Sequence, residues 1–110
     1  MGEHQAPFQI AILLYPGVTA LDAVGPWEVL SRMPHTETRF VGQEVGPVTT
    51  EGGALLLGVT HTIAETPSPD LVLVPGGSTM PGQMVDDEVL GWLRKAPKPR
   101  HGPFRSAPAR

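Results

Sequence analysis

Asp22 is the clearest candidate for acid–base chemistry in this chain. It stands between the apolar residues Leu21 and Ala23 near the start of a helix-like segment, so we expect its carboxyl group to be at least partly buried. A buried carboxyl group has a raised pKa and can act as a general acid or base, or pair with a nucleophile. The alternative role is a helix cap, because Asp favours helix starts. The residues alone leave both roles open.

A second candidate is the backbone of Gly76 and Gly77, which follow Pro75 directly after the apolar stretch LVLV. Backbone N–H groups without side chains allow a carbonyl oxygen or an oxyanion to approach closely. The competing interpretation is a plain turn, since paired glycines commonly end a strand. We name residues 75–77 the Pro-Gly-Gly turn.

Other reactive side chains are few. The 110 residues include no cysteine, which excludes a thiolate nucleophile, a thiolate metal site and a disulfide in the chain as written. His4, His35, His61 and His101 lack the spacing of metal ligands, so we expect no metal. Ser78 is outside a Gly-x-Ser-x-Gly setting, which disfavours a serine-hydrolase site.

A strand and a helix must position Asp22. The run FQIAILLY (residues 8–15) is continuously apolar and closed by Pro-Gly, which predicts a strand buried on both faces of a parallel sheet. Pro26 interrupts the following helix-like pattern. Because proline has no N–H and fits best in a first helical turn, we expect a short turn over residues 20–24 and a helix from Pro26 to Arg32.

The rest of the chain predicts further elements of an α/β fold. We expect a strand at residues 38–41, a hairpin of two extended pieces about residues 51–53, a buried strand within residues 70–77 and a helix from residue 86 to residue 95. The last helix begins with acids and ends with Arg94 and Lys95, which complements the helix dipole. This order predicts the opening half of an α/β sandwich with a mostly parallel sheet.

Composition limits the class of protein. The length suits one domain, and the net charge of −3 with scattered basic residues argues against nucleic-acid binding. No stretch has membrane-spanning length and the start lacks a secretory pattern, so we expect a soluble cytoplasmic protein without a membrane partner. All eleven acids precede residue 96, whereas half of the eight Lys and Arg residues follow residue 95. The composition therefore changes abruptly at this point.

Three stretches occur in an order and at a spacing typical of one family: ILLYPGVTALDAVGPWEVL, GPVTTEGGALLLGVTHTI and DLVLVPGG. Over residues 8–95 the chain resembles the N-terminal half of the ThiJ/PfpI superfamily. The form LD-x-x-GP-aromatic-E-V-L is most similar to the isonitrile hydratase-like branch. The resemblance implies a flavodoxin-like three-layer α/β sandwich with a mostly parallel sheet, here truncated after the first half, and a homodimer for the full-length form.

The resemblance also implies a site. Intact relatives carry a cysteine nucleophile on a strand-to-helix elbow, paired with an acid that corresponds to Asp22. The backbone of Gly76 and Gly77 would form part of the oxyanion site. The small-molecule substrate would be an isonitrile or a carbonyl-like compound, and water addition to the isonitrile gives an N-substituted formamide. Neither a metal nor an organic cofactor is implied.

The chain departs from the family pattern after residue 95. Relatives continue into an elbow of the form Ser-Val-Cys-Thr-Gly, whereas this chain continues HGPFRSAPAR (residues 101–110). If the last base of each codon is read with the first two bases of the next, these codons can encode Trp-Thr-(Val/Ile/Leu)-Ser-Val-Cys-Thr-Gly. The cysteine would then span the codons of Ser106 and Ala107. A frameshift in the gene or an error in its sequence is the explanation that we infer.

These observations define three segments: a flexible N-terminus at residues 1–7, half of a ThiJ/PfpI-like domain at residues 8–95, and an out-of-frame or disordered tail at residues 96–110. We expect an isonitrile hydratase-like lineage and no thiol-dependent activity in the chain as written. Two alternatives stay open. One is a non-catalytic ligand-sensing domain related to those fused to helix-turn-helix regulators, and the other is a fragment without function.

Overall fold

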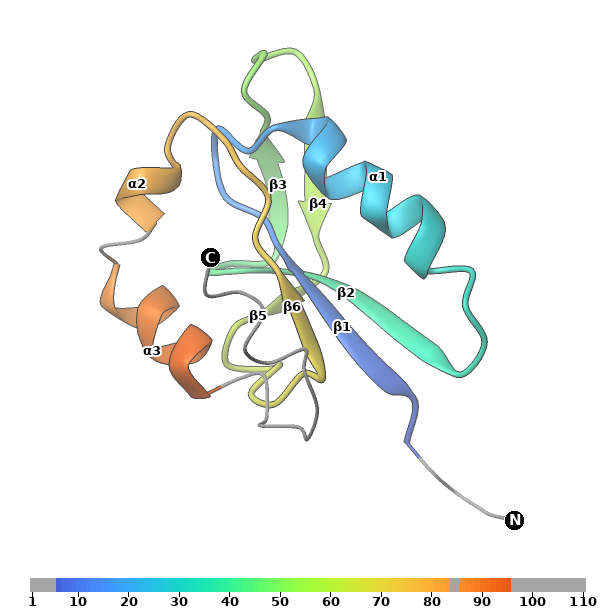
Figure 1. The fold of residues 1–110 in the computed structure, drawn as a ribbon. Coiled ribbons are helices and arrows are strands. Elements are labelled where there is room, and N and C mark those ends of the chain that lie inside the picture. The colour runs from blue at the N-terminus through green and yellow to red at the C-terminus, as the bar shows by residue number, and fades with distance from the viewer. Residues whose placement is uncertain (1–5, 84–85, 96–110) are drawn as a thin grey trace.

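Four parallel strands in the order β5-β2-β1-β6 form the central sheet of the computed structural model, which describes residues 6–83 and 86–95. The strands are β1 (Phe8–Leu13), β2 (Thr36–Gly42), β5 (His61–Thr62) and β6 (Leu71–Leu73). Helix α1 (Ala20–Leu30) lies on one side of the sheet, and α2 (Met80–Gln83) and α3 (Asp87–Lys95) lie on the other (Figure 1). The predicted mostly parallel α/β sandwich is confirmed. The predictions for residues 1–5 and for the tail fall outside the described residues.

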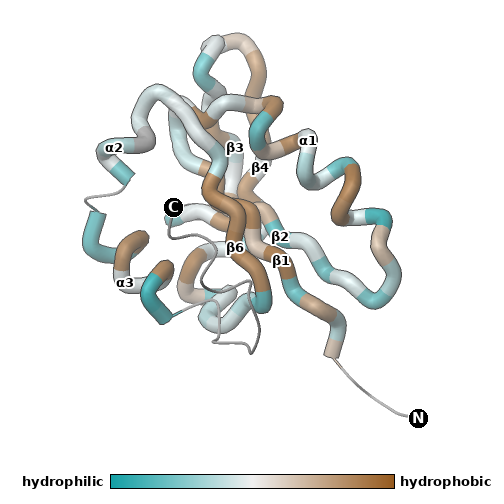
Figure 2. Tube along the Cα trace, in the orientation of Figure 1, coloured by the Kyte–Doolittle hydropathy of each residue, from teal (hydrophilic) through white to brown (hydrophobic). Residues whose placement is uncertain are grey.

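Strand β1 is the centre of the core. Every residue from Ile10 to Tyr15 is at most 2% exposed, and Figure 2 shows the apolar stretches of β1 and β6 side by side in the middle of the molecule. The strand pairs with β2 from Phe8↔Thr36 to Leu13↔Val41, and with β6 from Ile10↔Leu71 to Ile12↔Leu73. Because helices cover both faces and strands flank both edges, a continuous apolar run fits this position.

The two strands that pair with β1 differ from their predictions, β2 in length and β6 in burial. Strand β2 is longer than the predicted residues 38–41, because β1 supplies pairing partners from Phe8 onward. Strand β6 is half-buried rather than fully buried. Within the described residues no strand pairs with its outer edge, so the strand is not enclosed on that side.

The predicted hairpin is present. Strands β3 (Gly46–Thr49) and β4 (Leu56–Val59) are antiparallel, with Val48 opposite Leu57. In the connecting loop, Gly53 has a φ of +89°, a conformation in which an L side chain would be strained. The hairpin extends beyond the sheet near the start of α1 (Figure 1).

The predicted break before Pro26 is wrong, because α1 is one continuous helix from Ala20 to Leu30 with Pro26 inside it. Proline removes the hydrogen bond to the carbonyl of Asp22, four residues earlier, and its ring clashes with the Cβ of the preceding residue in a helical conformation. The preceding residue is Gly25, which has no Cβ. This Gly-Pro pair allows the helix to continue.

Helix α3 confirms the predicted acid-first helix. The Oδ1 atom of Asp86 accepts the backbone N–H groups of Glu88 at 2.9 Å and Val89 at 3.1 Å, which caps the first turn. Val89 and Trp92 are buried, and the indole N–H of Trp92 donates to the carbonyl of Thr66 at 2.7 Å. The short helix α2 was not predicted. No helix among the described residues has the length and apolar character needed to cross a membrane.

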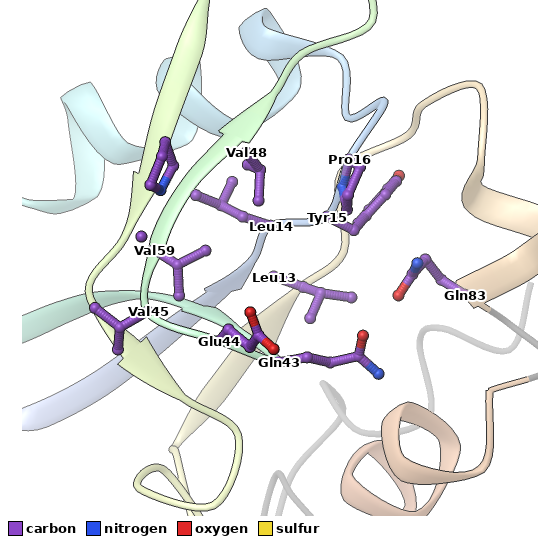
Figure 3. Close-up of a pocket in the computed structure, with 12 residues that line it drawn as sticks. Leu13, Leu14, Tyr15, Pro16, Gln43, Glu44, Val45, Val48, Val59 and Gln83 are labelled. Carbon is purple, nitrogen blue, oxygen red and sulfur yellow. The ribbon is translucent and has the colours of Figure 1, made fainter.

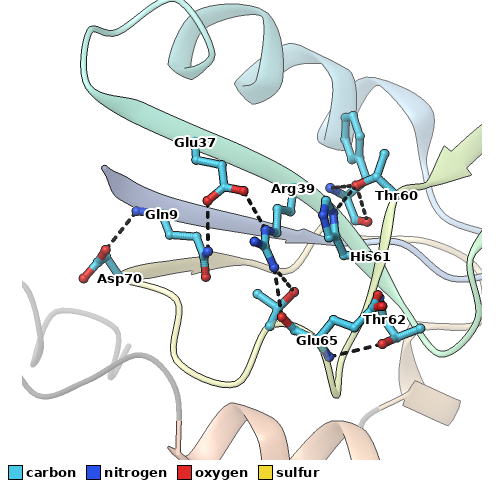
Figure 4. A network of polar contacts seen from close by, with 10 residues as sticks. Gln9, Glu37, Arg39, Thr60, His61, Thr62, Glu65 and Asp70 are labelled. Carbon is cyan, nitrogen blue, oxygen red and sulfur yellow. Dashed lines mark hydrogen bonds and ion pairs between the residues drawn. The ribbon is translucent and has the colours of Figure 1, made fainter. Parts of the chain in front are cut away.

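A polar network ties β1, β2 and the loop after β5 together (Figure 4). Glu37 accepts hydrogen bonds from the Gln9 amide at 3.1 Å and from the Arg39 guanidinium at 2.8 Å. Arg39 also donates to the carbonyl of Glu65 at 2.9 Å and to the hydroxyl of Thr66 at 3.2 Å. The hydrogen bonds from Gln9 and Arg39 lower the pKa of Glu37.

Candidate functional site

The register of the sheet brings Asp22 and the Pro-Gly-Gly turn to the same edge. Strands β1 and β6 run parallel, so the segments that follow them, residues 14–19 and 74–78, lie side by side. The N–H of Thr19 donates to the carbonyl of Gly76 at 2.8 Å, and the N–H of Ser78 donates to the carbonyl of Gly17 at 3.0 Å. Ligands of open α/β folds meet the chain at this edge, beyond the carboxyl ends of the strands.

Gly77 is required by close packing as well as by the turn. A Cβ atom at this position would lie 2.5 Å from the carbonyl oxygen of Gly17, 2.8 Å from the Cα of Val18 and 3.0 Å from the hydroxyl oxygen of Tyr15. No side chain fits there without displacement of the backbone. Within the described residues the N–H groups of Gly76 and Gly77 make no hydrogen bond, so both donors are available to a ligand.

The structure brings Asp22 next to this turn. Its Oδ2 atom lies 3.3 Å from the position that a Cβ atom of Gly76 would occupy. The expected burial of Asp22 is wrong, because Asp22 is exposed and Ala23 is the residue that α1 buries. Asp22 is not the helix cap either, since that position belongs to Thr19. What remains is an exposed carboxyl group directed at the Gly76 backbone.

Tyr15 is a site residue that the sequence reasoning missed. Its side chain is 2% exposed, and its hydroxyl donates a 2.5 Å hydrogen bond to the carbonyl of Pro75. Burial raises the pKa of the Tyr15 phenol, and the negative charges of Asp22 and Glu51 raise it further. The signal in the sequence was the position of Tyr15, whose polar hydroxyl directly follows the aliphatic residues 10–14.

Glu51, in the loop of the β3–β4 hairpin, is the second residue that was missed. Its Oε1 atom accepts the hydroxyl of Thr19 at 2.9 Å, and its N–H donates to the carbonyl of Val18 at 2.8 Å. A backbone bridge between Val18 and Thr50 adds to this connection. The hairpin therefore supplies a second carboxyl group near Tyr15, which could not be anticipated without the tertiary pairing.

A cavity of about 320 Å³ lies beside this cluster rather than over it (Figure 3). Tyr15 and Pro16 form one end, and Glu44 and Gln83 contribute polar groups. Asp22, Gly76 and Gly77 do not line it. The remaining lining residues are mostly apolar: Leu13, Leu14, Val45, Pro47, Val48 and Val59, with Gln43 and Gly46.

Neither His61 nor Ser78 belongs to a catalytic arrangement among the described residues, and His4 and His101 lie outside those residues. The ring of His61 contacts the hydroxyl of Thr60 at 2.9 Å and belongs to the polar network of Figure 4. The hydroxyl of Ser78 is 3.5 Å from the carbonyl of Gly17. Across residues 6–83 and 86–95, no three His, Asp or Glu side chains gather as metal ligands would.

Comparison with known proteins gives one family consistently. The family model described as DJ-1/PfpI family matches residues 8–103. An isonitrile hydratase from Pseudomonas putida is 37% identical over 86 residues, which are 78% of this chain and 37% of that protein. The chain thus spans little more than a third of the length of this curated relative.

Solved structures show the same fold. A ThiJ/PfpI family protein from Pseudomonas syringae superimposes with a TM-score of 0.75 at 28% identity, over 81% of this chain and 37% of that one. DJ-1beta from Drosophila melanogaster superimposes with a TM-score of 0.71 at 18% identity, over 80% of this chain and 48% of that one. The family model covers most of the sequence, so the chain belongs to the DJ-1/PfpI family.

Proposed function

We propose that the chain carries the acid and backbone half of an isonitrile hydratase-like site. The observation that carries the proposal is the approach of Asp22 to Gly76, 3.3 Å from the Cβ position of that glycine. The similarity to an isonitrile hydratase supports the same reaction. In this proposal Asp22 acts as a general acid and base. The N–H groups of Gly76 and Gly77 stabilise the negative charge that develops during the reaction.

The reaction needs a nucleophile in addition to these groups. A thiolate sulfur would bond to the carbon of R–N≡C while that carbon gains a proton, which gives R–N=CH–S–Cys. Water then adds to this carbon, the nitrogen takes a proton, and the carbon–sulfur bond breaks to release R–NH–CHO and the thiol. Asp22 can donate and accept the protons, and the turn can bind the oxyanion formed as water adds. The sequence contains no cysteine.

The chain as written is therefore expected to lack thiol-dependent turnover, because the thiolate does the attacking. The test is formamide production from a simple alkyl isonitrile. The 110-residue chain should produce no more formamide than its Asp22→Ala variant. Turnover above that control would contradict the proposal and would show that another group attacks the isonitrile.

We further propose that the cysteine is encoded out of frame after residue 95. Support comes from the shifted reading of residues 101–110, which can spell the elbow Ser-Val-Cys-Thr-Gly at the place where relatives have it. Sequencing genomic DNA from the Leu93 codon to about three hundred bases past Arg110 tests this proposal. One base gained or lost near codons 96–101 would support it, and an unchanged sequence with stop codons in every frame would refute it.

The cavity beside Tyr15 favours a second candidate, a non-catalytic ligand-sensing domain. Its volume of about 320 Å³ and its lining of apolar side chains with polar groups from Glu44 and Gln83 suit a small molecule. Saturable binding of a small molecule without turnover, together with a DNA-binding region encoded just downstream, would favour this function over the hydratase.

For the full-length form we propose a homodimer. Apolar side chains are exposed on α1 and on the hairpin, including Leu21 at 75%, Val29 at 66% and Leu56 at 56%. Exposed apolar side chains in such numbers are a feature of association surfaces. Sedimentation of the frame-restored protein, the product of the gene with its reading frame restored through the cysteine codon, tests the proposal. A monomer at micromolar concentration would contradict it.

A further inference from the structure

Two hydrogen bonds hold the two peptide groups of the Pro-Gly-Gly turn. The carbonyl of Pro75 accepts the hydroxyl of Tyr15 at 2.5 Å, and the carbonyl of Gly76 accepts the N–H of Thr19 at 2.8 Å. The first bond comes from a side chain and the second from the backbone, so a substitution can remove the first without changing the second. A substitution of Tyr15 can therefore test what this hydrogen bond contributes to the turn.

The geometry of a trans peptide converts these bonds into directions for the N–H groups. Within one planar trans peptide, the C=O and the next N–H point in opposite directions. A bond from Tyr15 to the Pro75 carbonyl therefore turns the N–H of Gly76 away from Tyr15. In the same way, the bond from Thr19 turns the N–H of Gly77 away from Thr19.

The packing around Tyr15 holds its hydroxyl, the hydrogen-bond donor, in one position. The β1–β6 register of Ile10↔Leu71 through Ile12↔Leu73, continued to the strand ends, places Tyr15 beside Gly76. The side chain is 2% exposed, and its hydroxyl oxygen is 3.0 Å from the Cβ position of Gly77. A buried side chain whose hydroxyl oxygen lies this close to the turn has little freedom to reorient, so its hydroxyl defines the position of the Pro75 carbonyl.

We propose that Tyr15 is a positioning residue that sets the orientation of the Gly76 N–H donor through its hydrogen bond to the carbonyl of Pro75. This inference rests on the proposed function, in which that N–H group helps to bind the oxyanion. Tyr15 itself need not touch the substrate. Without its hydroxyl the turn would keep its fold but lose the fixed orientation on which a preorganised oxyanion site depends.

Nuclear magnetic resonance of the isotope-labelled 110-residue chain tests this role without any turnover. In Tyr15→Phe, the Pro75 carbonyl and Gly76 amide resonances should move. The order parameter of the Gly76 amide should fall from about 0.85, typical of rigid backbone, to below about 0.6. That of the Gly77 amide should change less, because the hydrogen bond from Thr19 to the Gly76 carbonyl remains. The matched control is Trp92→Phe, which also removes an aromatic donor to a buried carbonyl, that of Thr66. It should leave residues 75–77 unchanged.

A second probe keeps the phenol hydroxyl in case Tyr15→Phe fails to fold. The chain contains one tyrosine, so biosynthetic 3-fluorotyrosine labels Tyr15 alone and strengthens its phenol as a donor. The Pro75 carbonyl resonance should then shift in the direction opposite to that in Tyr15→Phe. Resonances of residues 75–77 that stay unmoved, or that move as much in Trp92→Phe, would overturn the proposal. If these shifts appear while the frame-restored protein makes no formamide, the positioning role stands and the hydratase function fails.

Discussion

At the scale of single residues, Tyr15 gives a direct view of the charges around the site. It is the chain's only tyrosine, so absorbance near 295 nm follows its ionisation alone. Burial, Asp22 and Glu51 all disfavour the tyrosinate and raise its pKa above 10.0. We predict that Asp22→Asn and Glu51→Gln each lower the titration midpoint, because each removes a negative charge.

The matched control is Glu28→Gln. Glu28 also lies on α1, but its carboxylate is exposed and paired with Arg32. This variant should leave the midpoint unchanged. Because the folded pKa lies above the unfolded value of 10.0, the linked contribution to stability is present below pH 10.0 and is lost as pH rises through the folded pKa. A midpoint that shifts equally in all three variants would contradict the proposed arrangement of charges.

The two glycines of the turn should differ in their tolerance of a methyl group. Ala at Gly77 would meet the Gly17 carbonyl at 2.5 Å, whereas Ala at Gly76 would meet the end of the Asp22 side chain at 3.3 Å. We predict that Gly77→Ala lowers the free energy of unfolding by about 1–3 kcal/mol, and that Gly76→Ala costs less. Urea denaturation measures both, with Gly52→Ala as a control because its Cβ would meet nothing within 4 Å. Equal losses at Gly76 and Gly77 would disprove the close approach.

At the scale of elements, the Gly-Pro pair in α1 explains how the helix that carries Asp22 stays continuous. We predict that Pro26→Ala raises the free energy of unfolding by about 1 kcal/mol. The restored hydrogen bond to the Asp22 carbonyl outweighs the greater freedom that the unfolded chain gains when proline is removed.

A double-mutant cycle separates the two residues of this pair. Gly25→Ala should destabilise the chain while Pro26 is present, since the new Cβ meets the proline ring. In the Pro26→Ala background, the same change should stabilise by about 0.5–1 kcal/mol. Gly25→Ala effects of the same sign in both backgrounds would exclude this explanation.

The β1–β2 polar network should make stability depend on pH. The hydrogen bonds from Gln9 and Arg39 lower the pKa of Glu37, so its stabilising contribution is present above the unfolded value of 4.5 and is lost as pH falls through the folded pKa. We predict that Glu37→Gln costs about 0.5–1 kcal/mol at pH 7 and less at pH 3. Denaturation of wild type and variant at both pH values measures this, with Glu28→Gln as the exposed control. A loss independent of pH would show that charge plays no part.

Most elements could be predicted because their signals are local. The apolar run of β1, the glycines of the hairpin and the acid-to-base order of α3 each follow from neighbouring residues. The continuity of α1 was missed because Pro26 was weighed without Gly25. The site was predictable only in part, since Tyr15 and Glu51 enter it through the β1–β6 register and the hairpin contact, which join residues far apart in sequence.

At the scale of the whole molecule, the described residues have a packed centre and an incompletely covered sheet. Strand β1 is enclosed from Ile10 onward, yet β6 is half-buried and its outer edge is unpaired within the described residues. Such an edge exposes backbone groups that can pair with another strand. The chain covers only 37% of the curated relative and 48% of DJ-1beta, so we infer that added strands would cover β6 and complete the site wall.

The most direct test of the proposed site is the rate of formamide formation by the frame-restored protein. We predict turnover of a simple isonitrile that disappears when the cysteine codon is changed to serine. Asp22→Asn should lower kcat by about 10²- to 10⁴-fold, whereas Glu28→Gln should leave it unchanged. Absence of turnover in the restored protein, or turnover that survives both site changes, would contradict the assignment of Asp22 and the Pro-Gly-Gly turn to a hydratase site.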